Sequence, residues 1–346
     1  MRTALAAALV AGGLAVAGPT LAQSAATGLS TNVVFTVQSS LTGNAEVMRR
    51  VLSPLAAASV ERRLQAAGAV LADQQIDLSQ ERFLTYVPAP PASGRYGLVV
   101  FVPPWPGAML PKAWTPVLER AGLIFVTAAR SGNDATTLGR REPLAVLAAV
   151  NMLQRYPIDP ARVYIAGLSG GSRVALRLAI AYPDLFRGAI LNSGSDPVGG
   201  AEMPLPPPDL MQRLQEASGF VYVTGDGDGA VLADDDASRA SLRAICVFNL
   251  SVEMPPGVGH DIAPADALAR ALKTLDAPPH NDEGRLAACR AKLERDIDAR
   301  LAHVQALIAA GQRSQAQAAL NDVDNRYGGL AAPRSVQLAA SLPATP

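Results

Sequence analysis

The sequence is poor in the side chains that most protein metal sites require. It holds two cysteines, Cys246 and Cys289, and three histidines among 346 residues. No cysteine or histidine lies at ligand spacing from another, so we expect no metal site. In an oxidising compartment the two cysteines could form a disulfide, but spacing alone establishes no pair. We expect Cys246 to begin a buried strand and Cys289 to lie in a helix.

The chain also lacks net charge, since its 30 basic and 30 acidic residues cancel. Nothing in that total points to nucleic acid or to an anionic membrane surface as a partner. Hydrophobic residues make up 49% and charged residues 17% of the chain, a composition typical of a globular protein. The length suits one large domain with a smaller appendage.

After its first residues, the sequence has no apolar run near the roughly 20 residues that a membrane-spanning helix needs. The N-terminal run follows the pattern of an export signal. Arg2 supplies positive charge, residues 4–17 are apolar, and Thr20-Leu21-Ala22 forms a small-residue cleavage site. We therefore expect a signal peptide over residues 1–22, no stable membrane anchor, and a periplasmic or secreted protein.

Strands and helices alternate regularly over residues 83–277. Apolar runs such as "YGLVVFVP" and "AGLIFVTA" predict strands that are buried on both faces of a parallel sheet. Helical patterns between them, such as residues 143–155, predict βαβ units. The fold class is therefore α/β, a mostly parallel sheet with helices on both faces. In such sheets ligands bind beyond the carboxyl ends of the strands.

Two further segments flank this alternation. Residues 23–82 contain an expected strand, "TNVVFTVQ", and a helical stretch that Pro54 interrupts. After the proline-rich "DAPPHNDEG", residues 283–346 form an expected helical module with long helices over 285–310 and 314–324 and a short third one. The module resembles part of a tetratricopeptide-type repeat. It could pack on the sheet, pair with a second copy or bind another protein.

A serine stands between glycines where a strand meets a helix, in "RVYIAGLSGGSRVALRLA". A Gly-x-Ser-x-Gly turn of this kind raises the Ser169 hydroxyl above the sheet, and its glycines let neighbouring backbone pass closely. The following helix N-terminus favours developing negative charge. The alternative is a small-residue turn that only packs helix against strand. We favour a nucleophile.

A serine hydroxyl attacks only when a base takes its proton, and the three histidines can be compared one by one. His280 lies in the proline-rich linker and His303 within the C-terminal helix. His260 lies in "PPGVGHDIAP", a glycine-rich loop after the last expected strand. A loop in that position delivers a base to the serine, so His260 is the preferred base.

The acid that orients the base is expected after an earlier strand. Asp228 in "VYVTGDGDGA" is the first choice, and Asp226 in the same turn is the second. Asp196 in "NSGSDP" is the third. The run Asp234–Asp236 is expected to begin the next helix, over residues 237–245, because carboxylates suit a helix N-terminus.

An oxyanion hole needs two backbone N–H groups, one from Gly170 and one from the loop after "GLVVFV". That loop reads Pro103-Pro104-Trp105-Pro106, and proline has no N–H, so Trp105 is the first residue able to donate. Losing one donor costs about 10²–10³ in rate. The Trp105 side chain could instead line an acyl pocket or have a structural role.

At these residues the chain resembles the α/β-hydrolase superfamily. The run "DPARVYIAGLSGGSRVALRLA…YPDLFRGAI" is similar to the secreted polyhydroxybutyrate-depolymerase and feruloyl-esterase group. The resemblance covers roughly residues 83–275 and implies Ser169 as nucleophile, Asp228 as acid and His260 as base. It implies an exported serine esterase that acts on small or polymeric esters without a metal or organic cofactor. The Pro-Pro-Trp-Pro loop departs from the His-Gly that many members carry.

Two other functions remain open. A peptidase of the prolyl-oligopeptidase type would use the same three residues, although the chain has no room for a propeller domain. A non-catalytic binding protein would keep the fold and use its helical tail to dock a partner.

Overall fold

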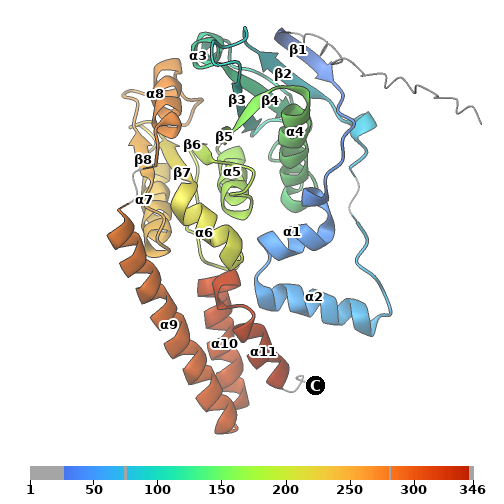
Figure 1. Cartoon of the computed structure of the whole chain (residues 1–346), viewed down its shortest axis with the longest axis vertical. Helices are drawn as coiled ribbons and strands as arrows, with labels where there is room; N and C mark the ends of the chain where they lie inside the picture. The colour runs from blue at the N-terminus through green and yellow to red at the C-terminus, as the bar shows by residue number, and fades with distance from the viewer. Residues whose placement is uncertain (1–26, 74–75, 280–281, 343–346) are drawn as a thin grey trace, which may run out of the picture.

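A single mixed sheet of eight strands forms the centre of the computed structural model, which describes residues 27–73, 76–279 and 282–342 (Figure 1). The expected signal peptide (1–22) and His280 lie outside these residues. The strands are β1 (Gly28–Val33), β2 (Phe83–Val87), β3 (Tyr96–Val102), β4 (Leu123–Ala128), β5 (Ile158–Leu168), β6 (Gly188–Asn192), β7 (Gly219–Val223) and β8 (Leu250–Glu253).

The strand order is β1-β2-β4-β3-β5-β6-β7-β8. β2 pairs antiparallel with both β1 and β4, and the strands from β4 across to β8 are all parallel. Every residue of β2, β3, β4, β6 and β7 is buried. The near-continuous apolar runs in the sequence are the consequence of this double-sided burial.

Two hydrophobic cores lie on opposite faces of the sheet, and alternate strand residues enter each. Leu98, Val100 and Val102 of β3 enter the core under α4 (Glu142–Arg155), α5 (Gly170–Ala181) and α6 (Pro208–Ala217). Val99 and Phe101 enter the core under α3 (Thr115–Ala121) and α8 (Ala265–Asp276). This period of two follows from the pleat of a strand. The predicted fold class, a mostly parallel sheet covered on both faces, is confirmed.

Three C-terminal helices, α9 (Glu283–Ala309), α10 (Arg313–Tyr327) and α11 (Arg334–Ser341), lie below α6 in the view of Figure 1. Ile297, Leu301 and Val304 of α9 share a buried cluster with Leu320 and Val323 of α10. The long amphipathic helix predicted over 285–310 therefore buries its apolar face against its neighbour. No helix among the described residues is both long and apolar enough to cross a membrane.

The N-terminal helices α1 (Asn44–Val51) and α2 (Pro54–Ala66) bridge the sheet region and the C-terminal helices. At the start of α2, Ser53 Oγ donates to the Asp324 carboxylate of α10, and the Leu55 N–H donates to Asp324 Oδ1 at 3.1 Å. Leu55 also packs against the cluster of the C-terminal helices. An acid from α10 thus helps to cap a helix more than 250 positions earlier in the chain.

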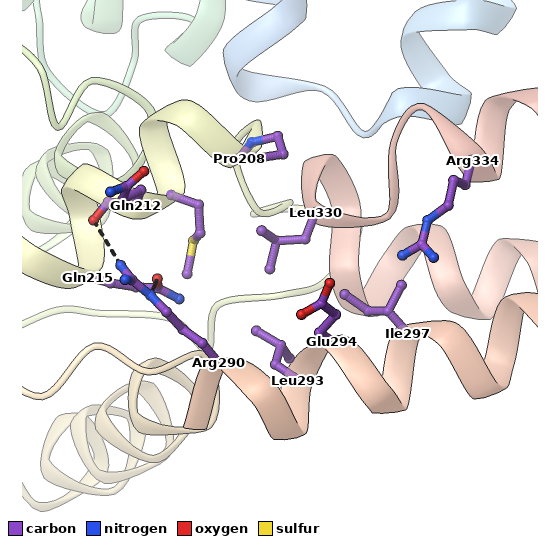
Figure 2. A pocket seen from close by; sticks show the side chains of 10 residues that line it. Pro208, Gln212, Gln215, Arg290, Leu293, Glu294, Ile297, Leu330 and Arg334 are labelled. Carbon is purple, nitrogen blue, oxygen red and sulfur yellow. Dashed lines mark hydrogen bonds between the residues drawn. The ribbon is translucent and has the colours of Figure 1, made fainter. Parts of the chain in front are cut away.

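A disulfide joins Cys246 to Cys289 and ties α9 to the sheet region. Beside it, α9 passes α6, and the two helices line a cavity of about 390 Å³ (Figure 2). Arg290 of α9 reaches across to α6, where Nε donates to Gln215 Oε1 at 2.6 Å and Nη1 pairs with Glu216 at 3.0 Å. None of the three expected catalytic side chains lines this cavity.

Three expected boundaries differ from the structure. β8 begins at Leu250 rather than at Cys246, which lies in a turn with φ of 67°. α7 (Gly229–Ala244) begins eight residues before the expected start at 237, so Asp234–Asp236 lie inside the helix and not at its N-terminus. The Asp228 carbonyl already accepts a hydrogen bond from the Leu232 N–H at 3.0 Å, which lets the helix begin there. β1 ends at Val33, five residues before the end of "TNVVFTVQ".

Candidate active site

Ser169 lies at the sharp turn between β5 and α5, with φ of 80° and ψ of −116°. A positive φ is uncommon for a residue other than glycine, and such strain collects at functional positions. The Ser169 N–H donates to the Asn192 carbonyl of β6 at 2.9 Å, which holds the turn against the neighbouring strand. The turn therefore directs the hydroxyl beyond the carboxyl edge of the sheet.

The glycines around Ser169 are required by close backbone contacts. A Cβ on Gly171 would lie 2.0 Å from the Val102 carbonyl oxygen at the end of β3. A Cβ on Gly167 would lie 2.3 Å from the backbone of Gly171. Strand β5, helix α5 and the end of β3 thus touch backbone to backbone at this point, which only glycine permits.

His260 lies on the loop between β8 and α8, and the structure brings it to the serine. Ser169 Oγ donates to His260 Nε2 at 2.8 Å. The His260 side chain is 47% exposed, so its ring is accessible from solvent. The buried Asn192 side chain holds this loop, donating to the Asp261 carbonyl at 3.1 Å and accepting from the Ala263 N–H at 2.6 Å.

Asp228 completes the chain of contacts. Its Oδ2 accepts from His260 Nδ1 at 2.7 Å, and its side chain is 12% exposed. The two alternatives are engaged elsewhere. Asp226 accepts the Gly257 N–H at 2.7 Å, and Asp196 pairs with Arg173 at 2.9 Å. Of the three candidate acids, only Asp228 contacts the imidazole.

Asp235, which was expected at a helix start, braces the ends of the strands instead. It is buried inside α7, accepting from Ser195 Oγ at 2.5 Å and from Thr224 Oγ1 at 2.6 Å. Burial raises the pKa of its carboxyl group. Ser195 and Thr224 follow β6 and β7, so this contact fixes the turn from which Asp228 projects.

The expected oxyanion donors lie on adjoining loops. Neither the Gly170 N–H nor the Trp105 N–H donates a hydrogen bond within the described part of the chain. The loop of Trp105 is held by the Asn133 N–H, which donates to the Pro104 carbonyl at 3.0 Å. The indole of Trp105 packs against the core on the α3/α8 face, its ring centroid 6.3 Å from that of Phe101. The side chain therefore anchors the loop, while the backbone N–H of Trp105 forms no hydrogen bond in the described part of the chain.

A cavity of about 810 Å³ adjoins the serine turn, and sequence reasoning missed the residues that shape it. Gly170, Asn133 and Arg141 are among its lining residues. A Cβ on Gly170 would lie 2.2 Å from Asn133 Oδ1, so the Asn133 amide rests on the first residue of α5. Asn133 follows β4 in "RSGND", and polar residues at the carboxyl end of a central strand were the available signal.

The strand order, the antiparallel edge and the serine at the β5–α5 turn together decide the fold. The chain has the α/β-hydrolase fold. No protein-family model matches the sequence. A stretch of 54 residues is 44% identical to poly(3-hydroxyalkanoate) depolymerase C of Paucimonas lemoignei. It covers 15% of this chain and only 13% of the depolymerase.

Solved structures with this fold are similar at low sequence identity. S-formylglutathione hydrolase of Staphylococcus aureus has a TM-score of 0.44 at 14% identity, over 56% of this chain and 92% of its own. A ferulic acid esterase has a TM-score of 0.41 at 16% identity, over 56% of this chain and 89% of the esterase. Est1E of Butyrivibrio proteoclasticus has a TM-score of 0.41 at 18% identity, over 57% and 94%.

Proposed function

We propose that the protein is an exported serine hydrolase that cleaves carboxylic esters. The observation that carries the proposal is the hydrogen-bonded series Ser169–His260–Asp228, with contacts of 2.8 and 2.7 Å. Such a series of hydroxyl, imidazole and carboxylate is recognised by its geometry and by the role of each group. The name of the depolymerase relative supports an ester as substrate.

The proposed reaction begins when Ser169 Oγ attacks the ester carbonyl and His260 Nε2 takes the hydroxyl proton. Asp228 accepts the Nδ1–H of His260, which keeps Nε2 free as acceptor and stabilises the imidazolium. The protonated His260 then gives its proton to the leaving alkoxide, and an acyl-enzyme remains on Ser169. Water enters, His260 takes its proton, and collapse of the second intermediate releases the carboxylic acid and restores the serine.

Negative charge on the carbonyl oxygen develops next to the N-terminus of α5. The free N–H of Gly170 and the free N–H of Trp105 are the proposed donors to this oxygen. The positive end of the helix dipole adds to their effect. Because two prolines precede Trp105, the hole depends on one residue of that loop.

Export is supported by two features. The N-terminal pattern over residues 1–22 is typical of a signal peptide. The Cys246–Cys289 disulfide is the kind of bond that persists outside the reducing cytoplasm.

A fluorophosphonate probe tests the proposed nucleophile. We expect one adduct, on Ser169, and hydrolysis of p-nitrophenyl esters somewhere in the series from acetate to palmitate. Ser169→Ala should lower kcat by about 10⁶-fold and abolish labelling. His260→Ala should also abolish labelling, whereas the matched His303→Ala should leave it unchanged. A folded protein without an adduct at Ser169 would refute the proposal, and cleavage of aminoacyl p-nitroanilides but no ester would favour a peptidase.

A further inference from the structure

A buried arginine without a carboxylate partner lines the cavity beside the serine turn. Arg141 is 4% exposed. Its Nε donates to the Ser131 carbonyl at 3.0 Å and its Nη2 to the Pro103 carbonyl at 2.9 Å. Within the described part of the chain, no carboxylate lies in ion-pair contact with Arg141, and its hydrogen bonds are those of Nε and Nη2 alone. A buried charge without a counter-charge in contact is costly, and a carboxylate on a ligand would offset that cost.

A second buried arginine shows what the ordinary arrangement looks like. Arg50 is also 4% exposed, but it pairs with Asp184 at 2.6 Å and with Glu46 at 2.6 Å. Its charge is neutralised within the protein. The two guanidinium groups have the same burial and differ in that Arg141 is held only by neutral carbonyl groups.

The other two arginines that line the cavity each have a carboxylate partner. Arg173 pairs with Asp196 at 2.9 Å, and Arg177 pairs with Glu142 at 2.8 Å. Glu202 is an exposed lining residue, and no ion pair involves it in the described part of the chain. Asp134 and Glu142 attract Arg141 electrostatically, but neither forms an ion pair or a hydrogen bond with it in the described part of the chain.

We propose that Arg141 binds a free carboxylate of the substrate, so that the protein prefers esters carrying a second, anionic end. The inference rests on the proposed function, because the cavity that Arg141 lines also contains Gly170, the residue after the nucleophile. A carboxylate there would accept charge-assisted hydrogen bonds from the guanidinium and supply the missing counter-charge. The Asn133 amide, which rests on Gly170 in the same cavity, offers a further donor.

Two matched pairs of esters test the proposal and locate the carboxylate. The first pair compares mono-p-nitrophenyl glutarate with p-nitrophenyl pentanoate and tests for a carboxylate on the acyl side. The second pair compares 4-acetoxybutyrate with butyl acetate and tests for a carboxylate on the alcohol side. In at least one pair, wild-type kcat/KM should be about 10- to 100-fold higher for the anionic ester. Arg141→Gln should remove most of that ratio, chiefly through KM. The measured quantity is the ratio of kcat/KM for the anionic ester to kcat/KM for the neutral ester. Arg141 also holds the Pro103 loop, so its loss can lower the activity on both esters of a pair without changing this ratio.

Arg173→Gln is the matched control, since this arginine lines the same cavity but already has a carboxylate partner. It should change the ratio by less than about threefold, because its charge is already paired. An equal loss in Arg141→Gln and Arg173→Gln, or a wild-type ratio near one in both pairs, would overturn the proposal. If Arg141→Gln does not fold, inhibition of the wild type decides: glutarate should compete with p-nitrophenyl pentanoate and the neutral glutaramide should not.

Binding to Ser169→Ala separates this inference from the proposed function. Calorimetry with 4-acetoxybutyrate and with mono-p-nitrophenyl glutarate should show binding that Arg141→Gln in the same background weakens about 10-fold or more. Binding without hydrolysis by the wild type would refute the esterase and keep the carboxylate site. Hydrolysis of neutral esters with no charge preference and no such binding would keep the esterase and refute the site.

Discussion

The carboxyl edge of the sheet and the C-terminal helices are held together by different kinds of contact. At the edge, backbone lies against backbone: a Cβ on Gly171 would meet the Val102 carbonyl, and one on Gly194 would lie 2.5 Å from the Ser169 carbonyl oxygen. In the helices, interdigitating side chains such as Leu301 and Leu320 form the cluster. A Cβ on Gly311, between α9 and α10, would meet nothing within 4 Å.

The difference teaches where each region tolerates change. Side-chain packing can relax around a substitution, whereas two backbones in contact cannot make room without moving a strand. The edge therefore holds Ser169, His260 and Asp228 to a fixed geometry. The helices can vary in sequence as long as their apolar stripe persists.

Among the comparisons of the two regions, the largest expected effect distinguishes two carboxylates in one turn at this edge. Asp228→Asn should lower kcat about 10⁴-fold, because the amide no longer holds His260 in the required tautomer. Asp226→Asn should cost less than about 10-fold, since Asp226 contacts the Gly257 N–H and not the imidazole. Steady-state ester hydrolysis by the two variants, with circular dichroism to verify folding, makes the comparison. Equal losses would show that the acid is misassigned.

The disulfide tests whether the two regions are coupled. It closes a loop with a sequence separation of 43, so Cys246→Ser/Cys289→Ser should lower the free energy of unfolding by about 4 kcal/mol. Neither cysteine contacts Ser169, His260 or Asp228, so kcat at 25 °C should stay within twofold. Urea unfolding and ester hydrolysis measure the two quantities. A fall in kcat without a change in stability would show that the C-terminal helices act on the site.

Two glycine substitutions compare the regions directly. Gly171→Ala should destabilise the protein by about 3 kcal/mol or more, because the new methyl group meets a backbone carbonyl. Gly311→Ala should cost about 1–2 kcal/mol, from its positive φ of 72° alone. Thermal unfolding of both variants provides the test. A smaller loss for Gly171→Ala than for Gly311→Ala would contradict the contrast drawn between backbone and side-chain contacts.

The smallest expected effect concerns ion pairs at α1, which adjoins α5. Hydrogen bonds from Arg49 and then Arg50 lower the pKa of Glu46 from 4.5 to about 2. Because the folded pKa lies below the unfolded one, the stabilisation is complete above about pH 4.5 and is lost as the pH falls toward 2.

The Tm of the wild type should therefore fall more steeply between pH 4.5 and 2 than the Tm of Glu46→Gln, which has no such group to titrate. Differential scanning calorimetry across this pH range tests the difference. Parallel profiles would show that the Glu46 pairs add nothing to stability.

Much of the site follows from local patterns in the sequence. The β5–Ser169–α5 turn is marked by an apolar run, a glycine-flanked serine and an alanine-rich helix, all within some twenty residues. The choice of His260 was possible because the sequence has three histidines and this one lies in the loop after the last expected strand. The choice of Asp228 over Asp226 was a preference, since two residues in one glycine-rich turn differ only in the direction of their side chains.

Other features depend on contacts between distant segments. The expected helix start at Asp234–Asp236 was wrong because Asp235 is drawn inward by Ser195 and Thr224, which lie on other elements. No sequence motif marks Asn133 or Arg141. Arg141 differs from an ordinary surface arginine only through its burial and its lack of a counter-charge, neither of which a linear pattern records.

The sequence by itself determined the α/β alternation, the serine turn and the loops that carry His260 and Asp228. These depend on hydrophobic period and on glycine, which act over short stretches of chain. Only the tertiary structure decided which aspartate meets His260, that Cys246 pairs with Cys289, and that Arg141 faces the cavity without a partner. Each of these depends on which side chains meet after the sheet closes, and burial sets the electrostatic consequence.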